Sequence, residues 1–455
     1  MATENLYKKS YSKIFAFYYL VEGFSQGIPF LVFPPYMAKL LGNQYDIAQW
    51  LIIASIGSLP WAIKMIIGVA NDKWGSKKYG NRFPWILSFG IFGAIFWFLM
   101  AAYLPTDESI YVFVAFYYFM IAIGTAFSDT ALDGLILDVT PKTNLGRIQG
   151  FTWMCLLLGM GAGGILLGLI FLALDLVPLL FIITGSLMVI ACFLTKLIKE
   201  PPLEKVIGKY IGRNLKSIFT KKKNWKVMSF TFTSSITGAV ITTFFTYVIL
   251  IALNVIDVQE TILSITSGSA VELLGWTSVF YFFNGLGTVI GSVVAGKYSD
   301  KFRRKSIVTA YLIFIPFCLV SIIPFILTGA YLIALIYGLI GQILFGAVSG
   351  ALLISGAAIR ADIVKKEYPE LKSTYYALLI SFWNGGQTLG NLLGALLFTF
   401  LALNFPGVGF YLLYFMLSIF GAAALLISFF LFKTIDPRDY EFEHILGEEK
   451  EVYFG

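Results

Sequence analysis

Histidine, cysteine and charged residues are scarce in this sequence of 455 residues. The one histidine, His444, and the three cysteines show no local pairing of the kind that binds a metal. Only 13% of the residues are charged, whereas a soluble globular protein has about 25%. No Gly-x-x-x-x-Gly-Lys-Ser/Thr loop for nucleotide phosphates is present, and no nucleophile–base pair is visible. We therefore expect no metal, no cofactor and no enzymatic activity.

Long apolar segments take the place of the missing charges. Hydrophobic residues make up 58% of the chain, and the mean hydropathy is +0.81. A helix of about 20 apolar residues crosses the hydrocarbon core of a bilayer. The sequence therefore predicts an all-α membrane protein with twelve transmembrane helices, near residues 14–41, 47–70, 84–104, 110–138, 148–174, 179–198, 227–255, 274–297, 306–328, 330–363, 374–402 and 409–432.

Basic residues fall in alternate loops of this arrangement. If the N-terminus is cytoplasmic, 31 of the 33 Lys and Arg residues lie on the cytoplasmic side, and the exceptions are Lys39 and Lys64. Cytoplasmic loops are enriched in these residues, so we expect both termini in the cytoplasm and place the chain in the plasma membrane. The net charge of +7 then reflects topology, and we expect no nucleic acid partner.

The two halves of the chain echo each other. Gly68 and Asp72 follow the second predicted helix, and at an offset of 228 residues Gly296 and Asp300 follow the eighth. Repeated halves are typical of transporters that rock about a central site, so we expect alternating access, in a monomer. The predicted parts are a cytoplasmic N-tail (1–13), a six-helix bundle (14–198), a cytoplasmic linker (199–226), a second, pseudo-symmetric six-helix bundle (227–433) and a cytoplasmic C-tail (434–455).

The loops after the second and eighth helices share a glycine, an aspartate four residues later and nearby basic residues. This pattern resembles the signature loop of the major facilitator superfamily, and the resemblance spans the whole chain. It implies a major facilitator fold in which such residues gate transport. We expect the glycine to permit close helix packing and the aspartate to latch neighbouring helices. The candidate gating residues are Gly68, Asp72, Lys73, Arg82, Asp138, Arg147, Gly296, Asp300, Arg303, Arg304, Arg360 and Asp362.

Four charged residues lie well inside predicted helices, away from the helix ends: Glu22, Lys64, Asp129 and Asp133. Such a residue costs about 2.5–3.5 kcal/mol on insertion scales. Glu22 and Asp129 lie near mid-depth, on helices that line the central cavity of a major facilitator fold. They bind substrate or protons, or else form a structural pair that locks helices. Lys64 either extends to the cytoplasmic interface or pairs with Asp129 or Asp133.

Uncharged polar residues complete the candidate site for substrate and protons. Gln26 shares the helix face of Glu22, at a spacing of four residues. In the second half Trp383 has an indole that can stack on a sugar or a planar ring. The other candidates there are Asn284, Gln342, Asn384 and Gln387.

The first half also resembles particular transporter families. Gly23-Phe-Ser-Gln-Gly27-Ile-Pro29 and the Asp129, Asp133, Asp138 and Pro141 spacing resemble the muropeptide permease and acetyl-CoA transporter family. The stretch from Leu59 to Gly68 is similar to folate–biopterin transporters. The loop from Asp72 to Ile86 is similar to glycoside–pentoside–hexuronide:cation symporters. The C-terminal half matches at superfamily level alone.

Together these features predict a secondary active transporter of a small polar organic solute, by symport with H⁺. A sugar conjugate such as a muropeptide is the leading solute. Glu22, Asp129 and Asp133 are the candidate proton carriers. One alternative is a glycoside symporter that uses Na⁺ or H⁺. The other is a sensor or scaffold that has kept the fold and lost transport.

Overall fold

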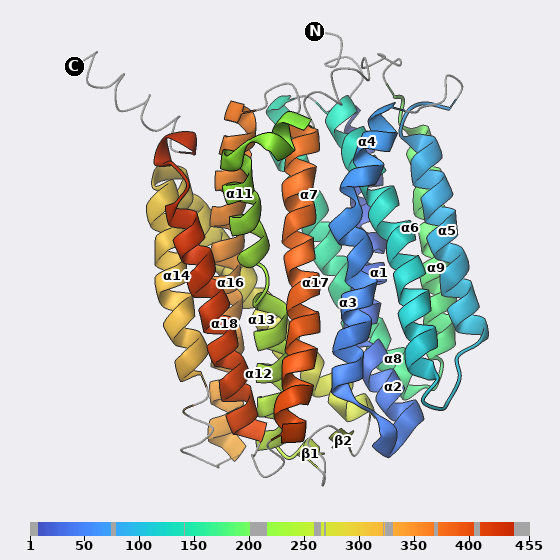
Figure 1. The fold of residues 1–455 in the computed structure, drawn as a ribbon. Coiled ribbons are helices and arrows are strands. Elements are labelled where there is room, and N and C mark those ends of the chain that lie inside the picture. The colour runs from blue at the N-terminus through green and yellow to red at the C-terminus, as the bar shows by residue number, and fades with distance from the viewer. Residues whose placement is uncertain are drawn as a thin grey trace. The chain divides into compact units, whose positions relative to one another are not determined.

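The computed structural model describes residues 8–73, 79–140, 142–200, 216–258, 265–267, 270–321, 323, 331–367, 372–404 and 410–440. Nearly all of these residues are helical (Figure 1). Contacts divide the chain into two compact units. Unit 1 comprises residues 1–211 and 264–278, and unit 2 comprises residues 212–263 and 279–455. The predicted bounds of the linker and the two tails stay predictions.

The first six predicted spans are helical. The elements are α1 (Lys9–Leu31), α2 (Phe33–Leu41), η1 (Gly42–Gln44), α3 (Ile47–Ile63), α4 (Met65–Lys73), α5 (Phe83–Ala102), α6 (Ile110–Val139), α7 (Lys142–Met160), η2 (Gly161–Leu167), α8 (Gly168–Ala173), α9 (Val177–Leu194) and η3 (Thr195–Leu197). Helix α5 packs against both α6 and α9, and α1 packs along α7.

The second six predicted spans are helical as well. The elements are α11 (Lys222–Thr233), α12 (Gly238–Ala252), β1 (Ile256–Val258), β2 (Ile265–Ser267), α13 (Ala270–Lys301), α14 (Arg303–Val320), α16 (Tyr331–Glu367), α17 (Lys372–Asn404), α18 (Phe410–Lys433) and η4 (Pro437–Asp439). In unit 2, α14 packs against α16 and α18, and α11 packs against α17 and α18.

The surfaces of these helices suit lipid. Eight helices of the described residues are long and apolar enough to cross a membrane, by length and composition. Large apolar side chains cover their outsides; Val112, for example, is 71% exposed and Leu403 is 66% exposed. Water would penalise so much exposed apolar surface, whereas a bilayer accepts it. The all-α membrane fold expected from the sequence is confirmed.

Prolines interrupt the first predicted helix, which was expected to be continuous. Helix α1 gives way to α2 at Val32, which lies between Pro29 and the pair Pro34 and Pro35. Each proline lacks the N–H that a helix interior needs and clashes with the preceding turn. The second predicted helix is also divided, into α3 and α4 at Lys64.

Hydroxyl groups accompany the break in the seventh predicted helix, between α11 and α12. Ser234 donates to the carbonyl of Thr231, and Ser235 donates to the carbonyls of Phe232 and, on α17, of Trp383. Side chains that bond nearby carbonyls compete with the helical ladder. In the fifth predicted helix, the glycine-rich segment 161–167 winds as a π-helix. Such irregular turns are frequent at functional sites.

Candidate functional site

Lys64 and Asp129 form a buried ion pair in unit 1. Lys64 Nζ lies 3.0 Å from Asp129 Oδ2, and the side chains are 11% and 5% exposed. The Trp61 ring centroid lies 5.3 Å from the same nitrogen. Of the two possibilities left open for Lys64, pairing with an aspartate is therefore the one that the structure contains. The ammonium stands at the junction of α3 and α4, and the carboxylate on α6.

Asp133, one turn after Asp129 on α6, accepts a hydrogen bond from α1. The Tyr19 hydroxyl donates to Asp133 Oδ1 at 2.5 Å. Sequence reasoning missed Tyr19. The available signal was its position three residues before Glu22, which puts both side chains on one face of α1. The hydroxyl of Tyr18 donates to Ser128 Oγ at 2.6 Å, so two adjacent tyrosines tie α1 to α6.

Glu22 completes the cluster from α1. Its side chain is buried, and Oε1 accepts a hydrogen bond from Gln26 Nε2 at 2.8 Å. The other oxygen, Oε2, is buried and has no hydrogen-bond partner among the described residues. Buried polar atoms are normally hydrogen-bonded. Glu22 lies close enough to Lys64, Asp129 and Asp133 to interact with each of them electrostatically.

Charge in this cluster is unbalanced. Three carboxyl groups surround one ammonium group, so full ionisation would leave an excess of negative charge in a medium of low dielectric constant. A proton on one of the carboxyl groups would reduce this excess. The arrangement can therefore hold and release a proton.

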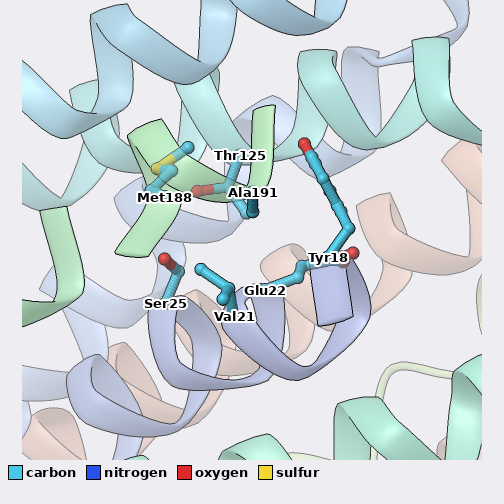
Figure 2. A pocket seen from close by; sticks show the side chains of 7 residues that line it. All are labelled: Tyr18, Val21, Glu22, Ser25, Thr125, Met188 and Ala191. Carbon is cyan, nitrogen blue, oxygen red and sulfur yellow. The ribbon is translucent and has the colours of Figure 1, made fainter. Parts of the chain in front are cut away.

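A small cavity adjoins Glu22 (Figure 2). Tyr18, Val21, Glu22 and Ser25 of α1 line one side of it, and the other lining residues are Thr125 of α6 and Met188 and Ala191 of α9. The cavity has space for about one water molecule. This cavity suits a proton or a water and is too small for an organic solute.

The same ion pair occurs at corresponding places in both units. In unit 1, Arg82 Nε at the start of α5 lies 2.8 Å from Asp138 Oδ2 near the end of α6. In unit 2, Arg303 Nε at the start of α14 lies 2.8 Å from Asp362 Oδ2 on α16. Of the other candidate gating residues, Arg304 is exposed. The side chains of Asp72, Lys73, Arg147 and Asp300 lie outside those that the structure describes.

The structure does not support the packing role expected for Gly68 and Gly296. A Cβ added at Gly68 would lie 3.7 Å from Thr130 Cγ2, and one added at Gly296 would lie 3.7 Å from Ile354 Cγ2. Both distances are ordinary van der Waals contacts, so neither glycine is needed to let helices approach. Whether these loops gate transport stays a prediction.

Amide groups link three helices in unit 2. Asn284 of α13 donates to Gln342 Oε1 on α16 at 3.1 Å, and Gln342 Nε2 donates to Thr246 Oγ1 on α12 at 2.8 Å. Gln342 is fully buried. Groups that bond to each other in this way hold helices together, and a solute would have to displace those bonds.

Arg360, expected at a gate, lies beside the candidate binding residue Trp383. The guanidinium carbon of Arg360 is 5.0 Å from the centroid of the Trp383 ring on α17. Arg360 is 1% exposed. Asn384 and Gln387 follow on α17 and are half-buried. The candidates of unit 1 thus gather around Glu22, whereas in unit 2 Trp383 contacts Arg360 and Asn284 bonds to Gln342.

Comparisons with known proteins agree with this architecture. The sequence profile of the Major Facilitator Superfamily matches residues 15–275 and 260–450. No curated protein sequence matches the chain. An inward-facing, unoccupied structure of a bacterial homologue of the human lysosomal transporter Spinster has a TM-score of 0.63 and 15% identity, over 95% of this chain and 98% of that one. The nucleoside transporter NupG has a TM-score of 0.62 and 12% identity, over 93% of this chain and 99% of that one. At these identities the likeness shows the fold.

Proposed function

Because the chain belongs to the major facilitator superfamily of transporters, we propose that it carries a small polar organic solute across the membrane in symport with H⁺. The buried carboxylate cluster of unit 1 is the observation that supports this proposal. A sensor or scaffold that has kept the fold and lost transport gains nothing from ionisable groups that cost free energy within lipid.

Within the cluster, Glu22 is the group best suited to carry the proton. Lys64 is the ion-pair partner of Asp129, and Asp133 accepts the hydrogen bond from Tyr19. Glu22 has a neutral amide neighbour, Gln26, and one oxygen without a hydrogen-bond partner in the part of the chain that the structure describes. A proton added to that oxygen would reduce the excess negative charge. Its release on the opposite side of the membrane would couple the proton gradient to movement of the solute.

The orientation and cellular setting form part of the same proposal. Both termini face the cytoplasm, because the basic residues gather in the loops on that side. The transporter acts as a monomer in the plasma membrane. An inward-directed proton gradient would then drive uptake of the solute by alternating access.

We would test the coupling in proteoliposomes with a sugar conjugate (an anhydro-muropeptide), a methyl glycoside and a nucleoside as solutes. The wild-type protein is expected to accumulate at least one of them under a pH gradient. Glu22→Gln should abolish this accumulation and retain exchange of labelled for unlabelled solute, because the neutral amide binds no proton. Asp175→Asn is the matched control, since Asp175 is an exposed carboxylate of unit 1 that pairs with Lys39 away from the cluster.

Each other outcome contradicts a defined part of the proposal. Full gradient-driven accumulation by Glu22→Gln would remove Glu22 as the proton carrier. Accumulation that needs a Na⁺ gradient and ignores pH would favour the glycoside:cation alternative. Absence of exchange with every solute would favour a sensor or scaffold.

A further inference from the structure

Arg360 of unit 2 is a buried cation that has no counter-ion among the side chains that the structure describes. It lies on α16, seven residues before the helix ends at Glu367, which is about 10 Å along the axis. Its side chain is 1% exposed, and Nε and Nη1 have no hydrogen-bond partner among the described residues. A buried charge is costly unless it is paired and hydrogen-bonded. The guanidinium group therefore lacks an anion.

The side chains around Arg360 supply no anion. Its electrostatic neighbours are the phenols of Tyr311 and Tyr376, and a phenol is neutral at physiological pH. The Tyr311 hydroxyl is already engaged with Ser428 Oγ at 2.6 Å. Asp362, two residues further along α16, is bonded to Arg303. Among the described side chains, no carboxylate pairs with Arg360.

A tryptophan and a glycine border the guanidinium group. The Trp383 ring lies 5.0 Å from its central carbon and fixes its position by a cation–π contact. Gly356, one turn earlier on α16, has no side chain beside Nη1, and a Cβ there would lie 3.2 Å from that nitrogen. The unpaired N–H groups are thus held in place with a small residue next to them.

We propose that Arg360 binds an acidic group of the transported solute, a carboxylate or a phosphate. The planar fork of an arginine matches the oxygens of both groups, and such charge-assisted hydrogen bonds are the strong ones. This inference rests on the proposed function, and it narrows the substrate class to organic anions. The acidic group would neutralise Arg360 in unit 2, while the proton site of unit 1 stays separate.

The test compares solutes that differ only in an acidic group, on protein purified in detergent. The pairs are N-acetylmuramic acid with N-acetylglucosamine, glucuronic acid with glucose, and uridine monophosphate with uridine. Binding is measured by calorimetry for the wild type, Arg360→Gln and Arg360→Lys. Lys433→Gln is the control, because Lys433 makes a comparable contact with Phe429 in the same unit, at 4.6 Å.

In at least one pair, the wild type should bind the acid about tenfold or more tightly than its neutral partner, as expected for hydrogen bonds to charged groups. Arg360→Gln should lose this preference and keep its affinity for the neutral partner, which shows that the protein is folded. Arg360→Lys should keep part of the preference, and Lys433→Gln all of it. If the acid binds more tightly only in the uridine pair, the group that Arg360 binds is a phosphate. If the acid binds more tightly in the sugar pairs, the group is a carboxylate.

Two results would overturn the inference. If the wild type binds the acid and its neutral partner with equal affinity in every pair, Arg360 is not an anion site. The proposed transport of a solute would not be affected by that result. A preference that survives in Arg360→Gln locates the anion site elsewhere. If neither member of any pair binds the wild type, the proposed function fails in these solute classes and the inference fails with it.

Discussion

Glu200 accepts hydrogen bonds from three backbone N–H groups at the start of α5. The donors are Asn81, Arg82 and Phe83, at 2.6, 2.9 and 2.8 Å from the carboxylate. The first N–H groups of a helix have no partner within the helix, and the helix dipole favours an anion there. Gly80 precedes them with a φ of +93°, and a Cβ on it would lie 2.5 Å from Glu200 Cδ. This contact holds the end of η3 against the start of α5.

Gly80→Ala should therefore destabilise the protein more than Gly42→Ala. Both glycines have a positive φ, but at Gly42 a Cβ would meet nothing within 4 Å. Backbone strain costs about 1–3 kcal/mol at such positions, so both variants should lower the unfolding temperature in detergent. The additional decrease in the unfolding temperature of Gly80→Ala measures the cost of displacing the Glu200 carboxylate. Equal losses in the two variants would mean that this contact contributes nothing to stability.

Sequence reasoning at the residue scale identified which groups matter but not which groups meet. Charge inside an apolar span singled out Glu22, Lys64 and Asp129 without any structure. Helical periodicity relates residues on one helix face, as for Glu22 and Gln26. The partner of Lys64 stands 65 residues away in the chain and that of Tyr19 stands 114 residues away. Such pairs depend on helix packing, which local spacing does not encode.

At the scale of elements, glycines let specific helices approach closely. A Cβ on Gly159 of α7 would overlap the carbonyl oxygen of Leu20 on α1. A Cβ on Gly390 of α17 would overlap the carbonyl oxygen of Ile236, in the segment between α11 and α12. Small residues allow such backbone contact between transmembrane helices. Gly159 and Gly390 thus mark contacts of the fifth and eleventh predicted helices with the first and seventh.

Gly159→Ala should lower stability, whereas Gly161→Ala should not. The two glycines are two residues apart, but a Cβ on Gly161 would meet nothing within 4 Å. Overpacking costs about 1–3 kcal/mol, so α1 and α7 would have to separate in Gly159→Ala. The unfolding temperatures of the two variants are measured in the same detergent. An unfolding temperature of Gly159→Ala equal to that of the wild type would show that the two helices can separate freely.

Hydropathy predicted where the helices lie but not where they break. Each predicted span contains helix, because apolar runs of that length have few other structures available in lipid. The break between α11 and α12 involves a hydrogen bond from Ser235 to the Trp383 carbonyl on another helix. A serine-rich stretch is equally compatible with an unbroken helix, so the break depends on a tertiary contact.

At the scale of the whole molecule, the repeat of the sequence is also a repeat of side-chain geometry. Each unit has an arginine at the start of one helix bonded to an aspartate near the end of another, with the same distance of 2.8 Å. The candidate site shows no such repetition, since unit 1 has a carboxylate cluster and unit 2 a buried arginine. We propose that the repeated ion pairs serve the motion shared by the two units, and that the unshared groups bind the proton and the solute.

Charge reversal tests whether the repeated pair controls conformational exchange. Arg82→Asp places two carboxylates where an ion pair stood, and adding Asp138→Arg restores opposite charges. We expect the single variant to slow solute exchange in proteoliposomes with little change in solute affinity, because the pair is separate from the Glu22 cluster. The double variant should recover exchange, since residues in direct contact couple by about 0.5–3 kcal/mol.

The same pair of variants in unit 2, Arg303→Asp with and without Asp362→Arg, should behave in the same way if the repeat is functional as well as structural. If the single variants lose solute affinity together with the rate of solute exchange, the ion pairs instead stabilise the fold of each unit. Recovery in one unit alone would mean that only that unit's pair takes part in the exchange between conformations. If the ion pair controls exchange in both units, the double variant must restore solute exchange in both, because each ion pair lies wholly within its own unit.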